Sequence, residues 1–145
     1  MYAIILDKNF WERMHGGSTH FPIALVLTSM LFDVLGYVWP AQTRRSEFHA
    51  VGFYLIVGAA LTSFGAVLSG LVISKWVVVG TGLTEKHHLF VWPAFALMIA
   101  LAVWRIITGK QASRTGFAVY LGAMGITSAL IATAGYWGGE MLIGS

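Results

Sequence analysis

Two histidines, His15 and His20, stand five residues apart at the start of a long apolar stretch, in the segment His-Gly-Gly-Ser-Thr-His-Phe-Pro-Ile-Ala-Leu. A second pair, His87 and His88, precedes another apolar stretch, and His49 lies between the two pairs. A histidine at the edge of a hydrocarbon layer is costly to desolvate unless it pairs with another group or binds a ligand. Imidazoles that face one another inside a helical bundle can ligate the iron of a b-type haem from both sides.

The composition is that of an integral membrane protein. Of the 145 residues, 57% are hydrophobic and 10% are charged, with a mean hydropathy of +0.75, whereas soluble domains carry about 25% charged residues. Four apolar spans are predicted, at residues 20–39, 50–74, 88–107 and 116–137. Each approaches the roughly 20 residues that cross about 30 Å of hydrocarbon, where only a helix satisfies its own backbone. Short connections then predict an all-α, antiparallel four-helix bundle, with residues 1–145 forming one transmembrane domain.

Two features of the composition narrow the possible functions. The chain has no cysteine, which excludes disulfides, thiolate metal sites and the Cys-x-x-Cys-His attachment of a c-type haem. Its net charge of +3 is too small to predict nucleic-acid binding.

The start of the first span carries helix signals. Ser18 or Thr19 is expected to cap the helix, with Pro22 in its opening turn. The residues before them lack the pattern of a signal peptide and are expected to form a short amphipathic segment anchored by Phe10 and Trp11.

The second half of the chain resembles the first, so the bundle is expected to consist of two repeated helical hairpins. The pattern Gly-Phe-x4-Gly-Ala begins at Gly52 and recurs at Gly116, an offset of 64. Two helices per repeat restore the chain direction, so the repeats would be related by an axis along the membrane normal. A weaker sequence similarity between the segments that begin at His20 and His88 would place these two residues on opposite sides of that axis.

The basic residues predict the orientation. One side of the membrane holds five of them and the other holds four. The two groups are Arg44, Arg45, Arg105, Lys110 and Arg114, and Lys8, Arg13, Lys75 and Lys86. Because basic loops stay in the cytoplasm, both termini are expected outside it.

This topology places four of the histidines at the outer face. The preferred axial pair is His20 with His88, His87 is the competing partner, and His15 is assigned a hydrogen bond to a haem propionate or a quinol. The opposite face offers only His49, so a single haem b is expected. Small residues along the second and fourth spans would leave room for the ring: Gly58, Ala59, Ser63, Gly65, Ala66 and Gly70, then Gly122, Gly125, Ser128, Ala129, Ala132 and Gly135.

Other interpretations of the histidines stay open at this point. If the small residues serve only to let the helices pack closely, the histidines would contribute only packing and hydrogen bonds. A bare copper or zinc site is the remaining interpretation, and Glu85 and Glu140 could complete it.

Asp33 lies within the first span, where a carboxylate is a functional candidate by default. The favoured interpretation is a bond to Arg44 or Arg45 across the following loop. A small transporter or metal-handling protein, with Asp33 and His49 on its path, is a further alternative, but no continuous polar stripe connects the two faces.

The opening motif His15-x4-His20-Phe-Pro-Ile-Ala-Leu, followed by Leu-Phe-Asp33-Val-Leu, resembles the bacterial membrane proteins grouped as domain of unknown function 2231. The resemblance covers nearly the whole chain. It implies four helices, a histidine at the head of the third helix (His87 or His88) and a closing Gly-Gly-Glu motif, which begins here at Gly138. It also implies a place in the bacterial inner membrane and an accessory role beside c-type cytochromes or oxidoreductases. In that membrane, the orientation expected from the basic residues makes both termini periplasmic.

This chain departs from the family pattern at two places. Gly16 replaces a proline of the opening motif, and the usual His-Gly does not follow Glu140. Any ligand that the family supplies after the glutamate is therefore absent here.

The sequence as a whole predicts a b-type haem subunit of an oxidoreductase complex. It would pass electrons between the quinone pool and an extracytoplasmic partner such as a c-type cytochrome, while catalysis belongs to another subunit. The alternative is a cofactor-free membrane anchor or assembly subunit of a larger respiratory or photosynthetic complex.

Overall fold

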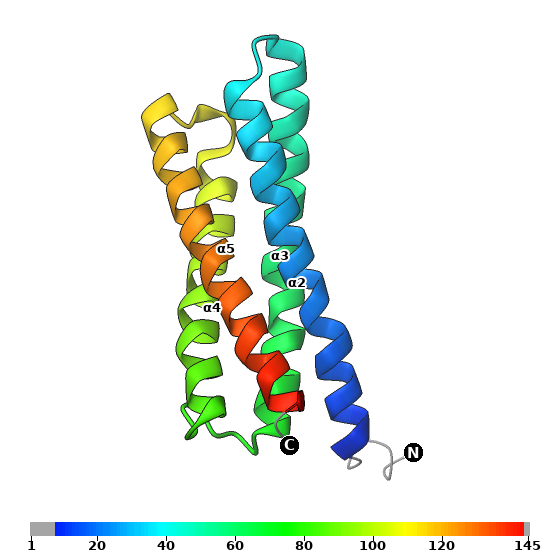
Figure 1. The fold of residues 1–145 in the computed structure, drawn as a ribbon. Helices are drawn as coiled ribbons and strands as arrows, with labels where there is room; N and C mark the ends of the chain where they lie inside the picture. The colour runs from blue at the N-terminus through cyan, green and yellow to red at the C-terminus, as the bar shows by residue number, and fades with distance from the viewer. Residues whose placement is uncertain (1–7, 144–145) are drawn as a thin grey trace.

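The computed structural model describes residues 8–143, apart from the side chains of Lys8, Asn9, Lys110 and Leu142. These residues form four long helices: α2 (Lys8–Val38), α3 (Gln42–Ile73), α4 (Leu83–Thr108) and α5 (Arg114–Ile143), with a short 3₁₀ turn, η1 (Gly109–Gln111), before α5 (Figure 1). All four helices are long and apolar enough to cross a membrane. The prediction of an all-α membrane bundle is confirmed. Part of the predicted amphipathic segment, residues 1–7, lies outside the described residues.

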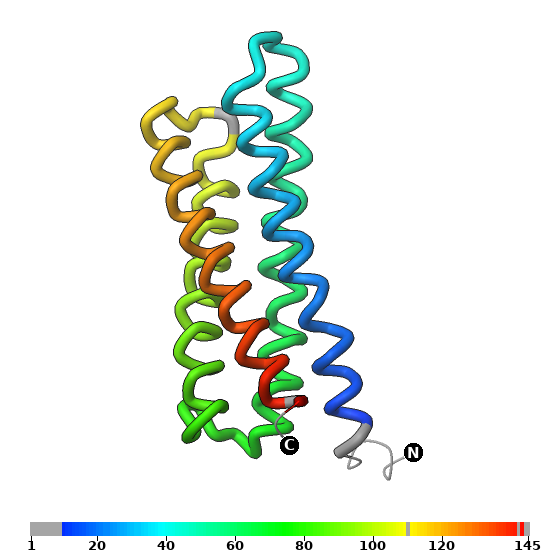
Figure 2. The backbone as a smooth tube through the Cα atoms, viewed as in Figure 1, coloured from blue at the N-terminus to red at the C-terminus, as the bar shows by residue number. Residues whose placement is uncertain are grey.

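Successive helices run antiparallel, so the described parts of both chain ends lie at the same end of the bundle (Figure 2). We call this the histidine end, because α2 and α4 begin there and bring His15, His20, His87 and His88 to it. The opposite end, the loop end, holds the α2–α3 and α4–α5 connections and His49. The structure therefore separates the histidines along the bundle as the spans predicted.

The first helix begins well before the predicted start. Because α2 starts at Lys8, Ser18 and Thr19 do not cap it, and their hydroxyls instead bond carbonyls three residues earlier in the same helix, at 3.3 and 3.1 Å. Pro22 consequently lies inside the helix rather than in its first turn. Since proline has no N–H, the carbonyl of Ser18 loses its usual helical donor. The predicted start at these residues was wrong because helix-start signals carry less weight where no water competes for the backbone.

The bundle consists of two hairpins, because α2 packs mainly on α3 and α4 mainly on α5. Buried positions recur between the hairpins at an offset of 72 in their first helices and 68 in their second helices. In the first helices, Pro22, Val26, Ser29 and Asp33 correspond to Ala94, Met98, Leu101 and Arg105. In the second helices, Gly52, Ile56, Ala59, Ala60, Ser63 and Ala66 correspond to Tyr120, Met124, Thr127, Ser128, Ile131 and Ala134.

The structural repeat differs in register from the sequence repeat. The Gly-Phe motif aligns Gly52 with Gly116 at an offset of 64, but Gly52 packs on Asp33 while Gly116 lies beside Ser113 at the start of α5. Burial aligns Gly52 with Tyr120 instead. The two structural offsets differ by four residues, about one helical turn. Figure 1 shows the α2–α3 connection reaching beyond the α4–α5 connection, which accounts for the difference.

Candidate functional site

His15 is held in place by α3. Its Nδ1 lies 3.0 Å from the carbonyl oxygen of Ala66 and 3.0 Å from Oγ of Ser69. Gly70 makes room for the ring, since a Cβ atom there would lie 2.9 Å from His15 Cε1. Because a carbonyl oxygen only accepts, Nδ1 carries the hydrogen and Nε2 keeps a free lone pair.

The second hairpin holds His87 in the same way. Its Nδ1 lies 2.8 Å from the carbonyl oxygen of Ala134, and a Cβ atom at Gly138 would lie 3.4 Å from His87 Nδ1 and Cε1. The corresponding residues of the first hairpin, at the same offsets of 72 and 68, are His15, Ala66 and Gly70. Each hairpin therefore presents one imidazole from its first helix, anchored through Nδ1 by its second helix.

The remaining histidines of this end lie differently. His88 is half-buried, and its Nδ1 donates to the carbonyl oxygen of Val79 at 3.1 Å, with the ring centroids of His87 and His88 5.8 Å apart. His15, His87 and His88 are close enough for their charges to interact. His20 is exposed on α2, because five residues turn a helical side chain by about 140° from His15.

The anchoring carbonyls of Ala66 and Ala134 were missed by the sequence prediction. Each begins an Ala-x3-Gly pattern, which ends at Gly70 or Gly138. The occurrence of this pattern in the helix that follows a histidine was the signal that could have identified the two anchoring positions. Several of the small residues proposed to line a haem slot are buried: Ala59, Ser63, Ala66 and Ser128. Five others are exposed: Gly65, Gly122, Ala129, Ala132 and Gly135.

The described side chains of the histidine end do not provide a full ligand set for a bare metal ion. Metal-ligating histidines almost always donate their other ring nitrogen to a carbonyl, carboxylate or water, as His15 and His87 do here. Across residues 8–143, no group of three or more histidine, aspartate and glutamate side chains is arranged to hold a metal ion. Glu85 and Glu140 therefore do not complete the alternative copper or zinc site.

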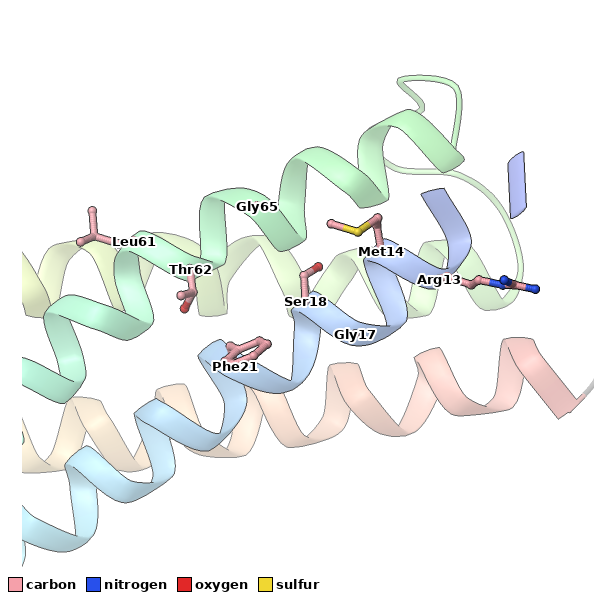
Figure 3. Close-up of a pocket in the computed structure, with 8 residues that line it drawn as sticks. All are labelled: Arg13, Met14, Gly17, Ser18, Phe21, Leu61, Thr62 and Gly65. Carbon is pink, nitrogen blue, oxygen red and sulfur yellow. The ribbon is translucent and has the colours of Figure 1, made fainter. Parts of the chain in front are cut away.

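A hollow of ≈ 470 Å³ lies near the histidine end, between α2 and α3 (Figure 3). Its lining includes Gly17, Phe21, Leu61 and Gly65, and no histidine. This hollow is a shallow feature of the outer surface of the first hairpin and is separate from the site of His15 and His87.

A buried polar cluster lies toward the loop end. Asp33 is fully buried, and its Oδ1 accepts a hydrogen bond from Arg105 Nη2 at 3.2 Å and lies 3.4 Å from His49 Nδ1. Its Oδ2 accepts a hydrogen bond from the hydroxyl of Tyr120 at 2.9 Å. Three other helices therefore converge on one carboxylate of α2.

The expected partners of Asp33 were wrong. Arg44 is exposed, and Arg45 Nη2 donates to the carbonyl oxygen of Trp39 at 2.9 Å. Asp33 pairs with Arg105 instead, because these two residues occupy corresponding positions in the two hairpins. The sequence prediction had counted Arg105 only among the basic residues that set the orientation, because it lies near the end of its predicted span.

Arg105 has a buried nitrogen that makes no hydrogen bond among the described residues. Its Nη2 also donates to the carbonyl oxygen of His49 at 2.6 Å, and its guanidinium carbon lies 5.1 Å from the ring centroid of Phe117. The Nε atom is buried and has no hydrogen-bond partner among the described residues.

Replacing Gly52 with alanine is expected to destabilise the protein by about 1–3 kcal/mol. The new Cβ would press directly on the carboxylate of Asp33, which its three partners hold in place. Unfolding by sodium dodecyl sulfate in mixed micelles measures the change. Gly65→Ala is the control on the same helix, since nothing lies within 4 Å of its Cβ position. An equal loss in both variants would contradict the close contact between Gly52 and Asp33.

The sequence profile of a family described as "Predicted membrane protein (DUF2231)" matches residues 13–144, which contain all five histidines and the whole polar cluster. No curated protein and no solved structure matches the chain significantly.

Proposed function

We propose that this chain, which belongs to the DUF2231 family of predicted membrane proteins, carries one b-type haem between its two hairpins and serves as an electron-transfer subunit of a larger membrane complex. The observation that carries the proposal is the equivalence of His15 and His87. They come from different hairpins, occupy corresponding positions, and each anchors Nδ1 on a carbonyl oxygen so that Nε2 is free.

In this proposal, His15 and His87 would hold the haem iron in place of His20 and His88. His20 is exposed and lies on a different side of α2 from His15. His88 lies beside His87 on the same helix and donates its Nδ1 hydrogen to Val79, so we assign its Nε2 the secondary role of accepting a hydrogen bond from a quinol hydroxyl or a protonated haem propionate. The hydrogen bonds from Nδ1 of His15 and His87 to the helix carbonyls fix both ring orientations and raise the basicity of Nε2.

When bound, haem b supplies one-electron transfer, with its potential set by the axial ligands and by burial. The chain holds it at the histidine end, within reach of a membrane-dissolved quinone. His49, at the loop end, is engaged with Asp33, so we propose no second haem. With the basic loop end in the cytoplasm of a bacterial inner membrane, the haem lies at the periplasmic face, where a c-type cytochrome or similar redox subunit is the partner.

Absorption spectroscopy of the purified protein tests this function. Expression in a haem-producing host should give a Soret band, a low-spin spectrum that changes on reduction, and a pyridine haemochrome of haem b at one haem per chain. A folded, monodisperse sample with no Soret band and no haemochrome would overturn the proposal. The cofactor-free anchor or assembly subunit would then be the better account.

A further inference from the structure

A groove of ≈ 560 Å³ opens at the loop end, far from the proposed haem ligands. It is formed by the end of α2, the start of α3 and the turn between α4 and α5. Its polar lining includes Arg45, His49, Arg105 and Arg114, and none of the residues that line it carries a carboxylate. This end of the bundle lies where the spans leave the hydrocarbon, at the depth of lipid headgroups.

The arginines of the groove carry an excess of positive charge. Arg45 donates to a backbone carbonyl, and the guanidinium of Arg114 lies 5.3 Å from the ring centroid of Tyr37. Neither forms an ion pair with a carboxylate of the described residues. Arg105 pairs with Asp33, but its side chain is 5% exposed and its buried Nε has no partner among the described residues. The groove is therefore lined by three guanidinium groups. The carboxylate behind them, Asp33, is already paired with Arg105, and Arg105 Nε has no acceptor among the described residues.

We propose that this groove binds the phosphate group of an anionic phospholipid. Guanidinium groups match phosphate oxygens through paired N–H donors, and basic pockets between membrane helices are suited to anionic headgroups. Arg45 and Arg114 bind the phosphate from the mouth of the groove, and Arg105 contributes its positive charge from the floor. The aromatic side chains of Phe53 and Tyr54 line the same groove, and Tyr54 is 73% exposed, so they pack along the glycerol and the first acyl carbons.

Lipid binding by the full-length chain tests this proposal independently of haem. Delipidated protein in detergent is titrated with phosphatidylglycerol and with phosphatidylcholine, and bound lipid is counted by native mass spectrometry. We expect one phosphatidylglycerol per chain, bound about tenfold more tightly than phosphatidylcholine. The double variant Arg45→Gln/Arg114→Gln should lose that preference. Arg105 is left unchanged, because its loss would leave Asp33 unpaired.

The control is Arg13→Gln/Lys86→Gln, which removes two exposed positive charges from the histidine end and should bind phosphatidylglycerol as the wild type does. Inorganic phosphate is added in a further arm. If inorganic phosphate does not displace the lipid, the groove binds a phospholipid headgroup. If phosphate displaces the lipid at millimolar concentration, the same phosphate site binds the free anion instead. Equal binding of the two lipids by the wild type, or an equal loss in both double variants, would overturn the proposal.

Discussion

Replacing either His15 or His87 with alanine is expected to abolish haem binding, whereas replacing His20 leaves it intact. Each proposed ligand would hold the haem iron from one hairpin, so its loss should exceed the roughly 10- to 100-fold loss of affinity caused by removing a group that only supports a metal ligand. The readout is the amount of haem per chain in the purified protein, from the pyridine haemochrome, together with the spin state of any haem that remains.

His20→Ala is the matched control, since it removes an exposed imidazole from the same helix as His15. Added imidazole should restore a low-spin spectrum in the alanine variants of His15 and His87, because it fills the vacated axial position without rebuilding any packing. His88→Ala should keep its haem with a shifted potential. Retention of haem by the His15 and His87 variants, with its loss in the His20 and His88 variants, would restore the pair first predicted from the sequence.

The choice between His15 and His20 depended on where the first helix begins. Composition predicted the spans well, because the cost of an unsatisfied backbone in hydrocarbon leaves few alternatives to a helix. The helix start was less predictable, because Ser18 and Pro22 are start signals in water but lie inside a longer membrane helix here. With α2 extended back to Lys8, His15 moves from a flanking segment onto the face that packs on α3.

The pairing between hairpins was also hidden from sequence comparison. A glycine-rich motif gave an offset of 64, while burial gives 72 and 68, because packing depends on depth in the bundle rather than on the identity of small residues. The offset of 72 links His15 to His87, and it also links Asp33 to Arg105. The second link is not visible in the residue types, since an aspartate and an arginine at equivalent positions do not resemble each other.

Breaking the pair between Asp33 and Arg105 is expected to destabilise the protein by about 3–5 kcal/mol. Asp33→Ala leaves the guanidinium buried without its carboxylate, and Arg105→Met leaves a buried carboxylate with only Tyr120 and His49 beside it. Tyr120→Phe removes one hydrogen bond and should cost only about 1 kcal/mol. Equilibrium unfolding in mixed micelles with sodium dodecyl sulfate measures all three variants.

The double variant Asp33→Leu/Arg105→Met tests whether the stability lost in the single variants comes from the interaction between the two charges. Because an apolar replacement of both buried charges is often neutral, the double variant should recover most of the stability that each single variant loses. Losses that simply add would mean that the two charges do not interact. Haem content should stay unchanged in the double variant, since the proposed ligands lie at the other end of the bundle and are anchored by bonds within each hairpin. Asp33 and Arg105 therefore hold the two hairpins together, and the distance between this pair and the histidines lets stability be changed without changing the cofactor site.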